Sequence, residues 1–186
     1  MRCRAELRSA DAAPLPTGVD SCTAVLAYEG AGRELLARLK YRNARSCVAW
    51  LAGQMAAAIE PTGIDVVTWV PTTVSRRRGR GFDQGELLAL AVARRLHRPC
   101  RELLSRRDGP PQTGRDAASR REGPTLVLRH ARVPARVLLI DDVITTGSSV
   151  TAAARTLRGG GAHLVRVCAG ARTSLKRTGK ASETCL

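Results

Sequence analysis

Two neighbouring groups of polar residues between positions 137 and 149 have the types and spacing to bind a small molecule. The first is the carboxylate pair Asp141 and Asp142, whose oxygens can accept hydrogen bonds from the hydroxyls of a sugar. The second is a run of small, mostly hydroxyl-bearing residues: Thr145, Thr146, Gly147, Ser148 and Ser149. This run leads into a predicted helix, and the unpaired N–H groups of a helix start favour a phosphate. Together the two groups predict a site for a sugar phosphate.

The same run has a simpler interpretation. Two solvated aspartates can end a strand, and a serine or threonine can cap the helix that follows, without any ligand. The order of apolar strand, acid pair, hydroxyl loop and helix over thirteen residues favours the sugar-phosphate interpretation. No glycine-rich nucleotide loop of the Gly-x-Gly-x-x-Gly or Gly-Lys-Ser/Thr kind competes for the phosphate.

The elements that must position these groups follow from the apolar pattern. Strands are predicted at residues 24–28, 64–70, 101–104, 125–128, 137–140 and 162–169, and helices at 32–41, 47–59, 85–96 and 149–157. Strands alternating with helices predict an α/β fold, in which helices flank a mostly parallel twisted sheet, with a short N-terminal helical segment. Such sheets bind ligands at the carboxyl ends of their strands, where Asp141 and Pro71 both lie.

Two predicted loops are rich in arginine. The loop at residues 72–84 carries Arg76, Arg77, Arg78 and Arg80, and guanidinium groups fork onto phosphate oxygens. An exposed, solvated surface is the alternative for this loop. The loop at residues 105–123 carries Arg106, Arg107 and Arg115. A non-periodic loop of that length in a compact domain is either a lid or disordered.

Charge is concentrated in one part of the chain. The formal net charge is +15, and residues 76–136 contain 16 arginines against six acidic residues. Such a concentration should attract polyanions such as pyrophosphate, nucleotides or a nucleic-acid backbone. Base-composition bias is an alternative reason for choosing arginine over lysine, but it does not explain the clustering.

Composition bounds the class of protein. The chain of 186 residues suits one compact α/β unit, and the absence of an apolar signal segment or a long apolar run predicts a cytoplasmic protein without membrane insertion. Its six cysteines are scattered, without a Cys-x-x-Cys pair, so a zinc site built from them is not expected. Aromatic residues are scarce: Tyr28, Tyr41, Trp50, Trp69 and Phe82. None of them lies between residues 165 and 186.

Position by position, the run 137–149 resembles the 5-phosphoribosyl-1-pyrophosphate (PRPP) signature of the type I phosphoribosyltransferases. The resemblance implies that Asp141 and Asp142 bind the ribose hydroxyls and that residues 145–149 wrap the 5-phosphate. It also implies Mg²⁺ bound with PRPP, with most ligands from PRPP and water and no metal site made by protein side chains alone. The arginines at 76–80 fall where this family holds pyrophosphate. Those at 106, 107 and 115 fall in its flexible catalytic loop, so they are candidate catalytic residues.

A narrower resemblance, over residues 24–172, is to the ComF family of competence proteins. It is carried by Val70-Pro71, by the run 75–84 and by Pro-Pro-Gln-Thr-Gly at 110–114. Members of that family carry a phosphoribosyltransferase domain and are linked to the handling of incoming single-stranded DNA. This chain departs from the family pattern at three places. Only Cys3 could remain of the usual N-terminal zinc ribbon, Asp83 replaces an asparagine, and residues 121–124 replace an Arg-x-x-Asn ending.

These observations predict three segments: an N-terminal segment at 1–60, a phosphoribosyltransferase-like core at 61–172 and a tail at 173–186. Three functions remain open. The chain could transfer a phosphoribosyl group to an unknown acceptor, or serve DNA uptake by holding single strands with a non-catalytic PRPP fold. A PRPP-sensing transcription regulator is the third, although no helix-turn-helix segment is evident. The oligomeric state stays open, a homo-oligomer included.

Overall fold

A four-stranded parallel sheet forms the centre of the protein, which we describe from a computed structural model over residues 7–39, 45–107 and 124–174. The strands are β1 (Ser21–Ala27), β2 (Val66–Trp69), β5 (Arg136–Ile144) and β6 (Leu164–Arg172), arranged in the order β1-β6-β5-β2. All three neighbouring pairs are parallel. All four strands therefore direct their carboxyl ends to one edge of the sheet, where ligands of such folds bind.

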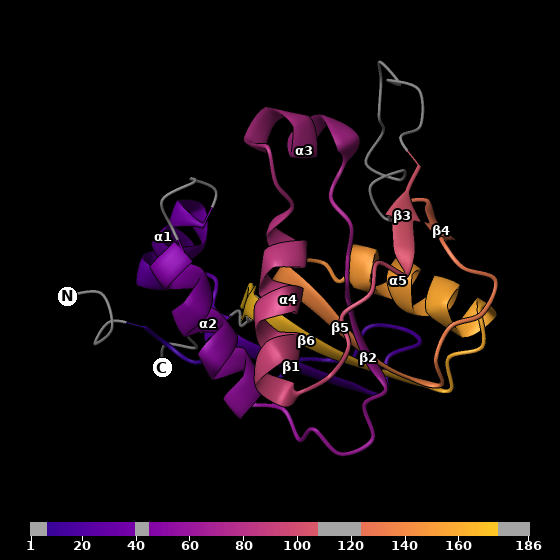
Figure 1. Cartoon of the computed structure of the whole chain (residues 1–186). Coiled ribbons are helices and arrows are strands. Elements are labelled where there is room, and N and C mark those ends of the chain that lie inside the picture. The colour runs from indigo at the N-terminus through magenta and orange to yellow at the C-terminus, as the bar shows by residue number, and fades with distance from the viewer. Residues whose placement is uncertain (1–6, 40–44, 108–123, 175–186) are drawn as a thin grey trace, which may run out of the picture.

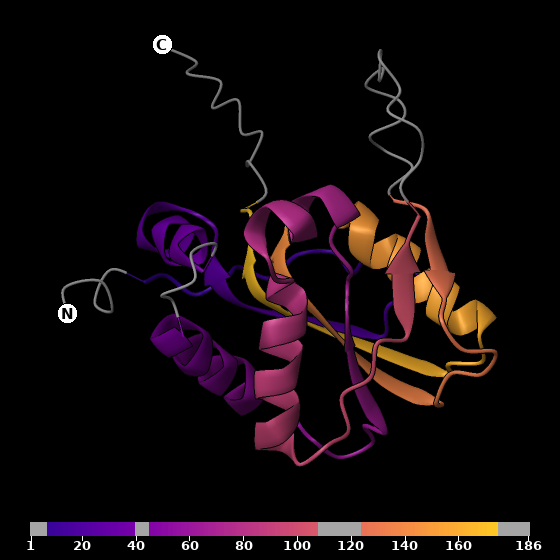
Figure 2. The same ribbon diagram turned by 45° about the horizontal axis from the view of Figure 1, so that its top comes forward.

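Helices cover both faces of this sheet (Figure 1). On one face lie α1 (Gly30–Arg38), α2 (Arg45–Ala57) and α4 (Gln84–Leu96). The other face is covered by α5 (Ser148–Gly159) and by a small antiparallel pair, β3 (Leu104–Arg106) with β4 (Leu126–Leu128). The short helix α3 (Val74–Arg80) stands away from both layers, above the start of α4 (Figures 1 and 2).

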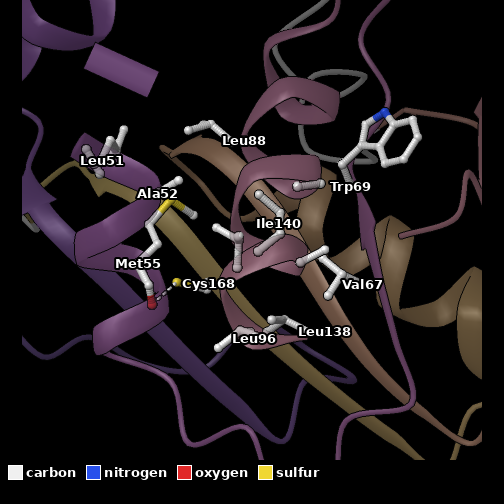
Figure 3. Close-up of a cluster of buried hydrophobic side chains, with 14 of the residues drawn as sticks. Leu51, Ala52, Met55, Val67, Trp69, Leu88, Leu96, Leu138, Ile140 and Cys168 are labelled. Atoms are coloured by element: carbon white, nitrogen blue, oxygen red, sulfur yellow. Dashed lines mark hydrogen bonds between the residues drawn. The ribbon is translucent and has the colours of Figure 1, made fainter. Parts of the chain in front are cut away.

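Alternation along β5 divides the core between the two faces. Leu138 and Ile140 pack with α2 and α4, whereas Val137 and Leu139 pack with α5 and the β3–β4 pair. Figure 3 shows the first of these clusters, in which the buried Cys168 thiol donates a hydrogen bond to the Met55 carbonyl at 3.8 Å. A strand buried on both faces requires the continuous apolar run that the sequence has.

The α/β fold with a mostly parallel sheet, predicted from the sequence, is confirmed. Cys168 lies in the core, as its apolar neighbours indicated, and the side chain of Trp69 is also buried. β1, which belongs to the predicted N-terminal segment, pairs with β6 in the same sheet as the core strands. In the part of the chain that the structure describes, no helix has the length and apolar character needed to cross a membrane.

Two predicted boundaries were wrong in ways that matter for function. The strand expected to end at residue 140 continues to Ile144, because β6 keeps pairing with β5 after β2 has ended at Trp69. Asp141 and Asp142 therefore lie within the strand, on a part of β5 that β2 does not cover. The loop expected at 72–84 contains helix α3, which the apolar pattern could not reveal because its one apolar residue, Val74, is exposed.

The β3 strand was also placed too early. It was expected at 101–104, but it spans Leu104–Arg106 and pairs with β4, away from the main sheet. Part of the long loop expected at 105–123 is therefore strand. Residues 108–123 of that loop, and residues 175–186 of the predicted tail, lie outside the described residues.

Candidate functional site

A cavity of about 460 Å³ lies at the carboxyl ends of the central strands. It is bounded by the last part of β5, by residues that follow β1, β2 and β5, by the starts of α4 and α5, and by one residue each of α1 and β3. Its walls contain Tyr28, Leu36, Val70, Pro71, Thr72, Phe82, Asp83, Gln84, Gly85, Arg106, Asp141, Asp142, Val143, Thr145 and Ser149. Both carboxylates of the predicted pair, and two residues of the predicted phosphate loop, are thus brought into one cavity.

The carboxylate pair is held in place by its own backbone. The Asp142 N–H donates to Asp141 Oδ1 at 2.9 Å, and the Val143 N–H donates to Asp142 Oδ1 at 2.8 Å. Asp141 is buried, and Asp142 is partly exposed. A carboxylate has two oxygens that can each accept more than one hydrogen bond, so the pair can also accept from neighbouring hydroxyls of a ligand.

Burial raises the pKa of Asp141 well above its ordinary range. The Asp142 carboxylate raises it further by repulsion and by a side-chain hydrogen bond, and Asp83 across the cavity adds a smaller contribution. Desolvation and like charges both disfavour an ionised carboxyl group. A ligand that donates hydrogen bonds or brings positive charge would relieve this cost.

The N-cap of α5 supplies no capping side chain. This residue, Gly147, adopts φ 77° and has no side chain that could accept a hydrogen bond from the first turn. Thr146 Oγ1 donates to Ser148 Oγ at 3.0 Å and accepts from the Ser148 N–H at 3.4 Å, which shapes the loop. The following N–H groups, at Ser149 and Val150, have no partner within the helix by its geometry. This is the arrangement that binds an anion at a helix start.

Helix α4 begins at the same cavity, and Asp83 caps its N-terminus. The Asp83 carboxylate accepts hydrogen bonds from the N–H groups of Gly85 at 2.9 Å, Glu86 at 3.4 Å and Thr72 at 3.0 Å. The bond from Thr72 joins the segment after β2 to the start of α4, and the residues between these two points contain α3. From the sequence, Asp83 was noted only as a replacement for the asparagine of the ComF pattern. The structure adds that it is the buried N-cap of α4.

The predicted arginines are separated by the fold. Arg106 lines the cavity, and Arg107 is exposed beside it in sequence. Arg77 pairs with Glu86 at 3.4 Å and with Glu102 at 4.0 Å, and Arg78 is exposed on α3. Arg115 and the side chains of Arg76 and Arg80 lie outside the described residues. A pyrophosphate role for the α3 arginines and a catalytic role for Arg106, Arg107 and Arg115 remain predictions.

Three apolar residues of the cavity were not identified from the sequence. Tyr28 follows β1, Leu36 is on α1 and Phe82 precedes α4. Only five residues of the chain are aromatic, and two of them lie here. That scarcity was the one available signal, because tyrosine and phenylalanine at a strand end or loop are otherwise unremarkable. Tertiary structure brings them together from positions 54 residues apart.

A divalent cation fits this cavity only as a companion of a phosphate ligand. Among residues 7–39, 45–107 and 124–174, no three His, Cys, Asp or Glu side chains are grouped so that they could hold a metal ion. Mg²⁺ commonly takes one or two carboxylates together with substrate phosphates and water. Asp141 and Asp142 would be the protein groups nearest in chemistry to that role. The ion would neutralise charge on the ligand's phosphates.

Comparison with solved structures identifies the fold. Glutamine PRPP amidotransferase from B. subtilis, complexed with ADP and GMP, is similar with a TM-score of 0.51 and 22% identity. A structure described as the allosteric regulatory enzyme of purine biosynthesis gives the same values. Each match covers 73% of this chain and 30% of the other. The fold is that of the type I phosphoribosyltransferases.

A purine phosphoribosyltransferase from Pyrococcus horikoshii has a TM-score of 0.47 and 17% identity, with 70% of this chain and 78% of that one covered. No protein-family model and no curated protein matches the sequence. The present chain spans about 30% of the length of the amidotransferase. The resemblance to ComF proteins, with its implied DNA-uptake role and single-strand binding, therefore remains a prediction.

Proposed function

We propose that the cavity binds PRPP together with Mg²⁺ and that the protein transfers the phosphoribosyl group to an acceptor. The observation that carries this proposal is the meeting of Asp141 and Asp142 with the uncapped start of α5 in one cavity. The carboxylates suit the ribose hydroxyls, and the α5 loop suits the 5-phosphate. The phosphoribosyltransferase fold supports the same assignment.

In the transfer, the bond from ribose C1 to pyrophosphate breaks and a bond from C1 to the acceptor forms. The protein's contribution would be positioning and electrostatic stabilisation. Tyr28, Leu36 and Phe82 give the cavity an apolar part that a sugar phosphate does not need. We assign this part to the acceptor, which would then present an apolar or aromatic face.

Calorimetry with PRPP in excess Mg²⁺ and with ribose 5-phosphate tests the proposal on the full chain. We expect both ligands to bind and to compete for one site. The Asp142→Asn variant should weaken both. Glu60→Gln is the matched control, since Glu60 precedes β2 at the opposite edge of the sheet and its substitution changes the charge equally. Failure of both ligands to bind the folded protein would refute the proposal.

A further inference from the structure

Asp83 occupies backbone groups that could otherwise receive an anion. Its carboxylate accepts from the N–H groups of Thr72, Gly85 and Glu86, and it is 4% exposed. N–H groups at a helix start are the usual backbone partners of phosphate oxygens. At the start of α4 these groups already have an anionic partner belonging to the chain itself.

The charge of the cavity reinforces this effect. Among its described lining residues, Asp83, Asp141 and Asp142 are acidic and Arg106 is basic. Asp83 is close enough to Asp141 to affect its ionisation, so the two ends of the cavity are electrostatically coupled. A ligand whose second anionic group faces Asp83 would be repelled, and this repulsion is strong where water is excluded.

The uncapped start of α5 lies at another part of the same cavity, next to Thr145 and Ser149. A single phosphate placed there avoids Asp83. A ligand with a pyrophosphate as well has to place negative charge elsewhere in the cavity, and the α4 start cannot accept it.

We infer that Asp83 is a specificity-determining residue: it makes the α4 end of the cavity reject anions, so that without a divalent cation the site prefers a ligand with one phosphate over PRPP. With a divalent cation on the pyrophosphate, the repulsion becomes attraction and PRPP binds. The inference rests on the proposed function, because it assumes that the α5 start holds the 5-phosphate.

Titration of ribose 5-phosphate and PRPP, each in EDTA and in excess Mg²⁺ at physiological salt, tests this directly. For the unmodified protein in EDTA we expect ribose 5-phosphate to bind about ten-fold or more tightly than PRPP, given one close like-charge repulsion. Mg²⁺ should remove or reverse this difference. The chain's net charge of +15 favours the more anionic PRPP at long range. Nonspecific electrostatic binding would therefore give PRPP the higher affinity, which is the opposite of what we expect in EDTA.

Two variants locate the effect at Asp83. In Asp83→Asn and Asp83→Ser, an oxygen acceptor for the α4 start is retained and the negative charge is lost. In EDTA, both variants should reduce the ratio of the affinity for ribose 5-phosphate to the affinity for PRPP at least five-fold. The affinity for ribose 5-phosphate itself should change little. Glu60→Gln, with the same change in charge at the other edge of the sheet, should leave the difference unchanged.

Several results would overturn the inference. One is PRPP binding at least as tightly as ribose 5-phosphate in EDTA. Another is an affinity ratio between the two ligands that stays unchanged in both folded Asp83 variants. A third is a reduction of this ratio in Glu60→Gln as large as that in the Asp83 variants. Each of these leaves the proposed function standing. If instead neither ligand binds with or without Mg²⁺, the proposed function itself fails.

Discussion

Helices α4 and α5 both begin at the wall of the same cavity, and their first turns differ. At α4, Asp83 has φ −100° and its carboxylate accepts from the N–H groups of Gly85 and Glu86. At α5, Gly147 has φ 77° and offers no side chain to the first turn. One helix start is satisfied by the chain itself, and the other is left to a loop of small residues and whatever binds beside it.

The two first turns show two uses of the backbone N–H groups at a helix start. A capped helix start contributes to folding stability, because its N–H groups no longer depend on water. An uncapped start forgoes part of that stability and retains its attraction for an anion. In this cavity, the α4 side holds the framework together and the α5 side is available to a ligand. Four predictions test that division.

The largest expected effect is on ligand binding at the β5 carboxylates. Asp141→Asn combined with Asp142→Asn should weaken PRPP–Mg²⁺ by about 2–4 kcal/mol, through loss of charge-assisted hydrogen bonds to the ribose hydroxyls. Calorimetry measures this directly, and circular dichroism should show that the fold survives. An unchanged affinity in the folded double variant would mean that these carboxylates do not contact the ligand.

Gly147→Ala should disrupt the α5 start. A residue with a Cβ at φ 77° costs on the order of 1–3 kcal/mol. The added atom would make an ordinary contact with the Pro16 side chain at 3.5 Å, so the cost comes from the backbone conformation. Thermal unfolding should shift down, and ribose 5-phosphate binding should weaken. Gly79→Ala in α3 is the control, since a Cβ there meets open space and the φ is not positive, so we expect no loss of either property.

Substituting one residue at each helix start compares how much the two starts contribute to folding stability. Asp83→Ala should destabilise the protein by about 1–2 kcal/mol, because the α4 cap is lost along with the bond to Thr72. Ser149→Ala at α5 should change stability by much less, since the N-cap of that helix is Gly147 and not a capping side chain. Urea unfolding of both variants measures this contrast. Equal destabilisation would show that the two starts are not used differently.

The smallest effect concerns Asp141 alone and depends on pH. Its folded-state pKa is raised by burial and by Asp142, so the folded protein holds this proton more tightly than the unfolded chain does. The charged form therefore costs stability, and that cost grows as the pH rises above the ordinary aspartate pKa of about 3.9 through the raised value. Asp141→Asn removes the cost.

The Asp141→Asn variant should accordingly unfold at higher urea than the unmodified protein at pH 7. Its advantage should shrink as the pH falls to about 4, near the ordinary aspartate pKa. An advantage that is independent of pH, or a loss of stability at pH 7, would contradict the assignment of Asp141 as a carboxyl group kept at a cost to folding. Such costs are common where a group serves ligand binding.

The parts of the site that lie close together in sequence were the most predictable. Asp141 and Asp142 and residues 145–149 come from one strand–loop–helix unit, so their spacing alone implied that they would face one ligand. Asp83 and Phe82 could not be placed in that way. They reach the cavity because β2 lies beside β5, and that pairing joins residues about 70 positions apart. Helix α3 was missed because it buries no apolar face.

The sequence by itself determined the alternation of strands and helices, the double-sided burial of β5 and the loop of small residues that leads into α5, because each of these depends on neighbouring residues. Tertiary structure alone decided that β6 continues past the end of β2 and keeps β5 paired through Ile144. It also decided that the Asp83 carboxylate accepts hydrogen bonds from backbone N–H groups of two segments, and that Tyr28 and Phe82 share a cavity with the aspartate pair. The physical reason is that strand pairing and burial join distant segments, and local residue patterns do not encode which segments meet.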